Sequence, residues 1–317
     1  MEKAILYFSE ESQPDTFCLE RTGIEVTGNC TLKCKLCGAY TPYRSPENSN
    51  DFSLQNLAKA IKQYFKIVTY VEQFSITGGE PLLCPHLSAL IKILKNYENQ
   101  FGTVALFTNG TIVPNQDLLM TAKDFGDKLS FSIDDYGSER SSKIKEIDTI
   151  LTNYGIRHTI RNYTKNDPHC GGWFDCGDLT EKKNRTKKEL EILYAKCIQP
   201  QKLHFCFNIS GRYMWPCSPL QKCNELGVVD DSTEYIDLLN DTLPVETQRS
   251  KIQAIYQKKY LSACAYCNGM CSDSPRVVPA EQLTKKEFLL TTRGGGGCRL
   301  YAEVQKMMKK SGDTEYD

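Results

Sequence analysis

Residues 24–37 read IEVTGNCTLKCKLC, and this stretch joins a β-forming segment directly to a loop that carries three cysteines. We expect a short strand at Ile24–Thr27, followed by Gly28 and the cysteine loop. Apolar side chains then recur at helical spacing within Ser53–Phe65, which predicts an amphipathic helix. The three parts together form one strand, loop and helix unit.

The same alternation of strand and helix recurs along the first half of the chain. Strands that alternate with helices are joined by right-handed crossovers and build a parallel sheet. With about five or six such units the fold class is α/β, a partial (β/α)6 TIM-like barrel whose ligands gather at the carboxyl ends of the strands. The expected strands are Val71–Thr77, Thr103–Thr108, Lys128–Ile133 and Ile156–Tyr163, and the expected helices are His86–Tyr97, Asn115–Ala122 and Ser141–Tyr154.

The pattern changes near Lys165, where DPHCGGWFDCGD reads as an irregular loop. A charged helix follows at about Thr186–Ala195, and then a hairpin whose strands are Leu203–Ile209 and Arg212–Trp215. The last part also contains an expected helix near Glu246–Tyr260 and a flexible loop at Gly294–Gly297. We divide the chain into an N-terminal extension (1–22), a barrel core (23–165), a linker (166–196) and a small hairpin-and-helix domain (197–317).

The composition is that of an ordinary globular protein, with 317 residues of which 40% are hydrophobic and 25% charged. Basic and acidic residues both number 39, so the net charge is zero and nucleic acid is disfavoured as a partner. The first residues are acidic where a signal peptide needs an apolar core, and no window resembles a membrane span. We therefore expect a cytoplasmic protein with no membrane partner. Its 15 cysteines then read as metal ligands or small buried side chains rather than as disulfides.

Cys30, Cys34 and Cys37 place three thiols where one loop can fold around a single metal centre. A closed zinc site takes four ligands, whereas a cubane cluster has four irons, so three cysteines leave one iron open to a substrate or cofactor. An open position is typical of a catalytic centre. The alternative is a zinc site whose fourth ligand lies elsewhere in the chain.

The spacing CxxxCxxC, here CTLKCKLC, resembles the signature of the radical S-adenosylmethionine (radical SAM) superfamily. The resemblance extends from about residue 22 to 163 through SITGGEP after the second strand, LFTNGT ending the third and FSIDDYG ending the fourth. It implies a reducible 4Fe-4S cluster on the three cysteines, with S-adenosyl-L-methionine bound at the fourth iron. It also implies reductive cleavage of that cofactor to a 5′-deoxyadenosyl radical, which takes a hydrogen atom from a substrate. A flavodoxin- or ferredoxin-type protein would supply the electron.

By the same resemblance, the strand ends contact the cofactor. The GGE-type motif lines its amino group, because glycines allow close approach of the main chain and an acidic side chain accepts hydrogen bonds from an ammonium. The residue before the last cysteine packs on adenine and is commonly aromatic in the family, whereas here it is aliphatic. Apart from the resemblance, alternation along the expected fifth strand places Arg157 or Arg161 to pair with an anionic cofactor or substrate group. The implied cofactor-binding residues are Leu36, Gly78, Gly79, Glu80, Asn109, Ser132 and Asp134.

A second set of cysteines lies in the C-terminal part of the chain. Cys197, Cys206 and Cys217 bracket the hairpin, and Cys264 and Cys267 form a CxxC motif. The arrangement resembles a twitch or SPASM-type auxiliary domain, and this resemblance implies a second 4Fe-4S cluster.

The number of cysteines in this set leaves the ligands undecided. A cubane takes four ligands and five cysteines are available, so either Cys197 or Cys206 is surplus. Only Cys271 and the distant Cys298 follow, so one auxiliary cluster of the shorter twitch type fits best. A structural zinc site made from the same cysteines is the alternative.

Three functions are compatible with these motifs. The first is an oxidoreductase or isomerase that dehydrogenates, epimerises or dehydrates a sugar, aminocyclitol or similar small molecule, because GGWFDCGD, CAYCNG and VPAEQ resemble uncharacterised radical SAM proteins of glycan pathways. The second is a maturase that epimerises, crosslinks or oxidises ribosomally made peptides, because twitch and SPASM domains are frequent in that class. The third is a non-catalytic iron–sulfur protein that only transfers electrons, and the GGEP motif argues against it.

A free thiol is a further catalytic candidate. Cys170, Cys176 or Cys223 could return a hydrogen atom to a substrate radical, as radical epimerases of this broad family do. Cys223 follows Cys217 most closely and is the candidate we name, although free cysteines are more often small buried side chains. The four histidines have no partner at metal-ligand spacing and receive no role.

Overall fold

A computed structural model describes residues 16–44, 52–164, 166 and 168–288. The predicted loop at Gly294–Gly297, Cys298 and most of the predicted N-terminal extension lie outside these residues.

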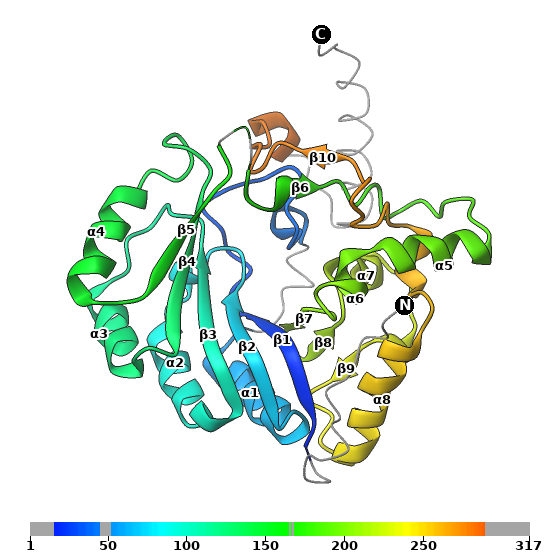
Figure 1. The fold of residues 1–317 in the computed structure, drawn as a ribbon, viewed down its shortest axis with the longest axis horizontal. Coiled ribbons are helices and arrows are strands. Elements are labelled where there is room, and N and C mark those ends of the chain that lie inside the picture. Colours follow the sequence, from blue (N-terminus) through cyan, green and yellow to red (C-terminus); the bar gives the residue numbers. More distant parts are fainter. Residues whose placement is uncertain (1–15, 45–51, 165, 167, 289–317) are drawn as a thin grey trace.

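Five parallel strands form one half of the molecule, and each strand pairs with the next along the chain. Helices α1 to α4 connect them and cover one face of the curved sheet (Figure 1). The α/β fold with a parallel sheet is therefore confirmed. The strands are β1 (Cys18–Glu25), β2 (Tyr70–Thr77), β3 (Phe101–Thr108), β4 (Leu129–Asp135) and β5 (His158–Asn162), and the helices are α1 (Leu54–Ile67), α2 (Leu87–Lys95), α3 (Gln116–Phe125) and α4 (Ile144–Tyr154).

The predicted hairpin extends this sheet. Strand β7 (Phe207–Ser210) pairs in parallel with β1, and β8 (Tyr213–Trp215) and β9 (Ile236–Asp237) follow in antiparallel order. Within the described residues the sheet has eight strands in the order β5-β4-β3-β2-β1-β7-β8-β9. The hairpin therefore shares backbone hydrogen bonds with the barrel strands, and β7 provides the sixth parallel strand.

Aromatic side chains pack the space between α1 and the sheet. Tyr64 and Phe65 of α1 contact Phe74 of β2, with ring centroids 5.5 and 5.6 Å apart, and Phe65 also contacts Phe101 of β3. The hydroxyl of Tyr64 donates to Thr22 Oγ1 of β1 at 2.8 Å, so this buried polar group is satisfied. The helix begins where the Ser53 side chain accepts from the Asn56 N–H, as an N-cap does.

The remaining elements surround the sheet edge that carries the hairpin. The segment expected to be irregular contains the short strand β6 (Trp173–Phe174), which pairs with β10 (Arg276–Val277) near the carboxyl ends of the barrel strands (Figure 1).

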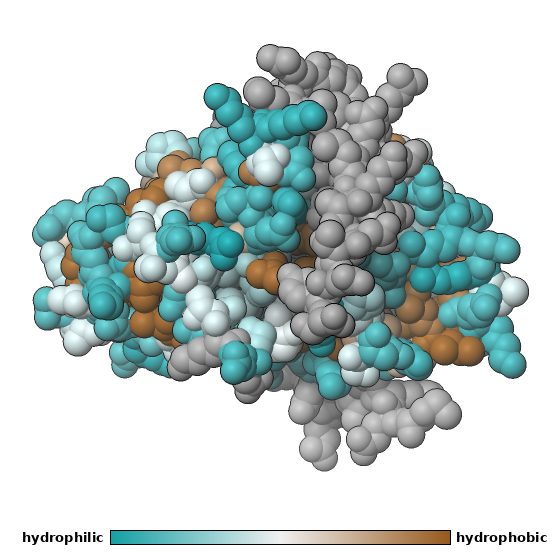
Figure 2. Space-filling view, turned by 90° about the horizontal axis from the view of Figure 1, so that it is seen from above, coloured by the Kyte–Doolittle hydropathy of each residue, from teal (hydrophilic) through white to brown (hydrophobic). Residues whose placement is uncertain are grey.

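Seen from that end, the coloured part of the surface is mostly hydrophilic, with hydrophobic residues in scattered patches (Figure 2). No helix among the described residues is long and apolar enough to cross a membrane. The helices here are α5 (Lys187–Lys196), α6 (Ile198–Gln201), α7 (Ser218–Glu225) and α8 (Val245–Gln257).

One buried carboxylate joins three parts of this fold. Glu25 ends β1 and is 3% exposed. Its carboxylate accepts hydrogen bonds from Arg44 at 2.7 Å, from Asn208 at 3.1 Å and from the Ser210 hydroxyl. Arg44 follows the cysteine loop, and the other two residues lie in β7. Glu25 therefore holds the barrel strand, the far end of the loop and the hairpin together.

Replacing Glu25 with alanine is expected to lower the free energy of unfolding by about 3 to 5 kcal/mol, because the buried Arg44 guanidinium loses its counter-charge. Replacing Glu146 with alanine removes a pair with Lys143 in which both side chains are about half exposed, and is expected to cost about 0.5 kcal/mol or less. Denaturant unfolding compares the two variants. Equal losses would contradict the role assigned to Glu25.

Candidate functional site

The cysteine loop lies directly after β1, as expected. Cys34 is buried, and Cys30 and Cys37 are half-buried. Burial raises the pKa of the Cys30 thiol to about 11 and that of the Cys34 thiol to about 12, and the charge of Cys37 adds to the rise in both. The charge of Cys37 thus acts on both other thiols, and that of Cys30 acts on Cys34, which places the three side chains near one another.

The GGEP turn after β2 packs on this loop. Gly79 N–H donates to Thr27 O at 2.9 Å, and Glu80 N–H donates to Asn29 O at 2.8 Å. A Cβ at position 79 would lie 2.1 Å from Asn29 O, so only glycine permits this approach. We predicted a close approach of the glycines to a ligand, and the structure shows a close approach to the cysteine loop.

Glu80 connects the same turn to the end of β3. The residue is fully buried, and its carboxylate accepts hydrogen bonds from Leu82 N–H at 3.0 Å, Thr108 Oγ1 at 2.9 Å and Asn109 N–H at 2.8 Å. Burial raises the pKa of Glu80, and these hydrogen bonds oppose that rise. Its contacts in the protein are thus structural, and the contact with an ammonium group stays a prediction.

Asn109 faces the cysteine loop from β3. Its Nδ2 donates to Thr31 Oγ1 at 3.1 Å and to Cys30 Sγ at 3.5 Å. The side-chain oxygen accepts from both the N–H and the hydroxyl of Thr111. The structure therefore brings the predicted Asn109 next to a predicted metal ligand.

Asp134, at the end of β4, forms an ion pair with Arg161 of β5. The guanidinium donates from Nε and Nη2 to the two carboxylate oxygens at 2.6 and 2.8 Å, and the Tyr136 hydroxyl donates to Asp134 Oδ2 at 3.0 Å. Such a two-pronged pair fixes both side chains. Arg157 instead donates to Asp127 O ahead of β4, at the opposite edge of the sheet, so only Arg161 lies at the carboxyl ends of the strands.

The other two predicted cofactor contacts are less constrained by the structure. Ser132 is half-buried in β4, opposite Phe107 of β3 and Thr159 of β5. Leu36 is half-buried in the loop between Cys34 and Cys37. Ser132 thus lies within β4 and Leu36 within the cysteine loop, and their contacts with a cofactor stay predictions.

Aromatic side chains form one wall beside the loop. Tyr136, Tyr163 and Trp173 pack in one cluster with Cys34 and Cys37. The Tyr136 ring centroid lies 5.1 Å from that of Tyr163 and 5.5 Å from that of Trp173. The wall therefore borders Cys34 and Cys37 with apolar surface.

The donor set of the loop fits an iron–sulfur cluster. Thiolates are the ligands of such clusters, and here they are shielded from water and approached by amide N–H groups. In a cubane each cysteine binds a different iron, so its thiols need not converge on one point. No group of three or more His, Cys, Asp or Glu in the described part of the chain is arranged to hold a single metal ion.

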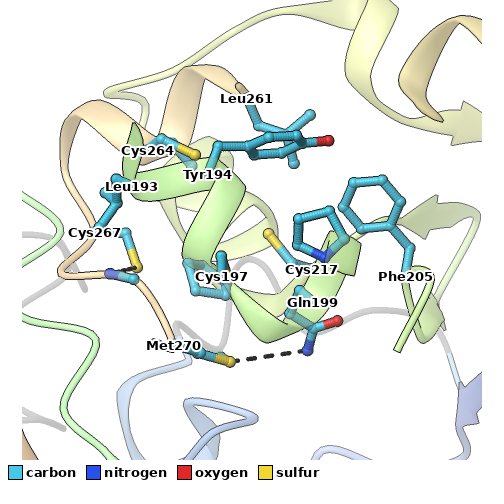
Figure 3. Close-up of a pocket in the computed structure, with 14 residues that line it drawn as sticks. Leu193, Tyr194, Cys197, Gln199, Phe205, Cys217, Leu261, Cys264, Cys267 and Met270 are labelled. Carbon is cyan, nitrogen blue, oxygen red and sulfur yellow. Dashed lines mark hydrogen bonds between the residues drawn. The ribbon is translucent and has the colours of Figure 1, made fainter. Parts of the chain in front are cut away.

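Four cysteines of the second set line one pocket. The pocket is lined by thiols just before α6, just before α7 and in the CxxC turn, among apolar side chains such as Leu261, and these thiols belong to Cys197, Cys217, Cys264 and Cys267 (Figure 3). The pocket holds about 470 Å³ of space free of protein atoms, including its opening to solvent. A mostly apolar pocket with four thiols has the ligand number of a cubane.

Cys206 is placed elsewhere. It is not among the described residues that line the pocket, and its charge acts on Tyr64 of α1 and Tyr256 of α8. By contrast, burial raises the pKa of Cys217, and Cys264, Cys267 and Cys197 raise it further. The structure thus groups Cys197 with the other three, which the sequence left open.

The CxxC turn is supported by donors that the sequence did not reveal. Arg185 donates to the carbonyls of Cys264 at 2.9 Å and Cys267 at 2.6 Å. A hydrogen bond from the Cys176 thiol lowers the pKa of Cys267, and the Gly269 N–H, 3.2 Å from its sulfur, acts in the same direction. Cys176 is therefore a neighbour of this pocket, and no sequence spacing could have shown it.

The other thiol candidates differ in their surroundings. Cys223 is fully buried in the core, with its sulfur 4.0 Å from Leu179 O, and its pKa is raised by burial. Cys170 is exposed. A hydrogen-donor role for either residue stays a prediction.

A sequence profile of the radical SAM superfamily matches residues 24–166. These residues are a radical SAM domain. The GTP 3′,8-cyclase of Aliarcobacter butzleri (strain RM4018) is 31% identical over 128 residues, which cover 40% of this chain and 38% of that enzyme. The chain thus spans about two fifths of the length of this curated relative.

Two solved structures resemble the chain. A structure of BtrN in complex with AdoMet and 2-DOIA has a TM-score of 0.48 and 14% identity, and the likeness covers 84% of this chain and 98% of BtrN. Native anSMEcpe with bound AdoMet and Cp18Cys peptide also has a TM-score of 0.48 and 14% identity, over 92% of this chain and 97% of that one.

Replacing Gly79 with alanine is expected to lower the free energy of unfolding by about 1 to 3 kcal/mol, because the added methyl group overlaps the main chain of the cysteine loop. The amides of residues 79 and 80 should then exchange with solvent faster, since both donate to that loop. Gly38→Ala is the matched control, with no atom within 4 Å of the added Cβ. Chemical unfolding and hydrogen exchange measure both effects, and an unchanged Gly79→Ala variant would contradict them.

Proposed function

We propose that the protein is a radical SAM enzyme that holds a 4Fe-4S cluster on Cys30, Cys34 and Cys37 and binds S-adenosyl-L-methionine beside it. The observation that carries the proposal is a radical SAM domain whose three loop thiols lie together at the carboxyl end of β1. When bound, the cluster would supply the electron that splits the cofactor into methionine and a 5′-deoxyadenosyl radical.

The chain's own residues would orient the cofactor and seal its site. Backbone hydrogen bonds from the GGEP turn hold the cysteine loop in position. Asn109, which follows β3, donates to Cys30 of the same loop. Asp134 neutralises Arg161, so the rim carries no isolated charge at that point. The aromatic wall of Tyr136 and Trp173 limits the access of water to the site. This exclusion is needed because a carbon radical attacks whatever lies nearest.

We further propose a second 4Fe-4S cluster on Cys197, Cys217, Cys264 and Cys267, in a twitch-type arrangement. The shared pocket and the mutual influence of the four thiols on their pKa values support this set. The cluster would either accept the second electron of an oxidation or anchor the substrate site. A zinc ion in place of this cluster would be seen by metal analysis.

For the substrate we favour a sugar- or aminocyclitol-like small molecule, changed by dehydrogenation, epimerisation or dehydration. The motif resemblance to proteins of glycan pathways supports this class. A cyclisation like that of the named relative, or modification of a peptide, would appear as a different product. Anaerobic incubation with candidate sugars, aminocyclitols, GTP and peptides, followed by product mass spectrometry, separates these outcomes, and conversion of GTP or a peptide alone would refute the small-molecule class.

Replacing Cys30, Cys34 and Cys37 together with alanine is expected to abolish 5′-deoxyadenosine formation and leave the second cluster visible in spectra. The loss follows because the cofactor then has no iron to bind. Cys18→Ala is the control, since this cysteine lies at the opposite end of β1. Cleavage of S-adenosyl-L-methionine that persists in the triple variant would defeat the proposal. Reduced wild-type protein that does not cleave S-adenosyl-L-methionine would also defeat it, because the protein would then be only an electron carrier.

Cys197→Ala is expected to lower the iron content after anaerobic reconstitution from about eight to about four atoms per chain, because it removes one of four ligands. Cys206→Ala should keep about eight, since this thiol lies outside the pocket. Metal analysis measures iron and zinc in both variants. The reverse pattern would show that Cys206 is the ligand. Zinc in the wild-type protein would show that these cysteines hold a zinc ion and not a second cluster.

A further inference from the structure

The last described residues of the chain lie against the cysteine loop. We call residues 280–288 the C-terminal strap. Its main chain forms an antiparallel bridge with the loop between Cys34 and Gln282, although 248 residues separate the two positions. The flanking backbone hydrogen bonds run from Lys35 N to Glu281 O and from Leu283 N to Lys33 O, both at 2.8 Å.

The side chain of Gln282 uses both ends of its amide on this loop. Its Oε1 accepts from Lys33 N–H at 2.7 Å, and its Nε2 donates to Cys34 Sγ at 3.3 Å and to Ala280 O at 2.7 Å. The orientation is dictated, because the Lys33 N–H can only donate and the Ala280 carbonyl can only accept. The N–H of Gln282 therefore points to a thiol that we assign to the first cluster.

Contacts other than this amide hold the strap in place. Ala280 is fully buried and Leu283 is 8% exposed. The Lys35 ammonium lies 2.7 Å from Glu281 Oε1 and 3.5 Å from Glu287 Oε1. The strap therefore has anchors that remain when the Gln282 side chain is changed.

We propose that Gln282 is a positioning residue for the first cluster, donating a hydrogen bond to the Cys34 thiolate that makes the cluster easier to reduce. The inference rests on the proposed function, because it requires a cluster on Cys34. A hydrogen bond to a ligand sulfur stabilises the more negative, reduced state and so raises the reduction potential. A residue that follows the second cysteine set in the sequence would thereby affect the reduction of the first cluster.

The geometry favours Gln282 over the other donor at the loop. Asn109 Nδ2 lies 3.5 Å from Cys30 Sγ and also donates to Thr31 Oγ1. The Gln282 donor lies closer to its sulfur, at 3.3 Å, and likewise donates to a second acceptor, Ala280 O. The two amides approach different thiols from different parts of the chain, so their effects are separable.

The test compares Gln282→Ala and Gln282→Glu in the reconstituted protein. Both variants lose the N–H donor, whereas glutamate keeps an oxygen that can accept from Lys33 N–H. The ratio of reduced to oxidised first cluster, read by electron paramagnetic resonance at a fixed ambient potential, is expected to fall about tenfold, which corresponds to about 59 mV for a one-electron couple. Hydrogen exchange at the Lys33 amide should quicken in Gln282→Ala and stay slow in Gln282→Glu.

Gln116→Glu is the matched control, because it makes the same chemical change on an exposed residue of α3. It should keep the wild-type ratio. A wild-type ratio in both Gln282 variants would overturn the inference while the proposed function stands. Failure of the wild type to bind a first cluster would instead overturn the proposed function. If Gln282→Ala loses the cluster, Gln282→Met, which keeps a neutral side chain of similar length without an N–H donor, decides the question, and a wild-type ratio in it overturns the inference.

Discussion

The site depends on the contact between the GGEP turn and the cysteine loop. Two backbone hydrogen bonds join the segments that follow β1 and β2. The segments approach so closely that only glycine fits at position 79. Glu80 carries this contact to β3 through its buried carboxylate. The cysteines therefore sit on a rigid platform made of three neighbouring strands, as a site that must orient reactive chemistry requires.

The parallel part of the fold could be predicted because its signals are local. Apolar periodicity and helix caps such as Ser53 lie within single elements, and most predicted strands and helices match the structure to within a few residues. The first strand is the exception, because it was expected at Ile24–Thr27 and begins at Cys18, within the stretch assigned to the N-terminal extension. The turn of the hairpin was predicted correctly. The pairing of the hairpin with the barrel sheet was not predicted. This pairing depends on contact between β7 and β1, nearly 200 residues apart, and on the polar link from Glu25 to Asn208. Neither leaves a pattern in the sequence.

The candidate sites divide in the same way. That the three loop cysteines, Asn109 and the GGEP turn lie close together could be predicted, because each motif stands at a strand end. The choice between Cys197 and Cys206 depends on which way the chain turns before β7, and spacing does not encode that direction. Cys176 beside Cys267 and Gln282 beside Cys34 are long-range contacts between residues of ordinary type. The two cysteine sets are thus each completed by residues from outside their motifs.

The most direct measurement is the electron paramagnetic resonance spectrum of the reduced, reconstituted protein with and without S-adenosyl-L-methionine. An open iron on the loop cluster predicts a signal that changes shape when the cofactor is added, because its methionine group then binds that iron. The signal of the second set should stay the same. Zinc on the loop cysteines, or an identical spectrum in both conditions, would contradict the account.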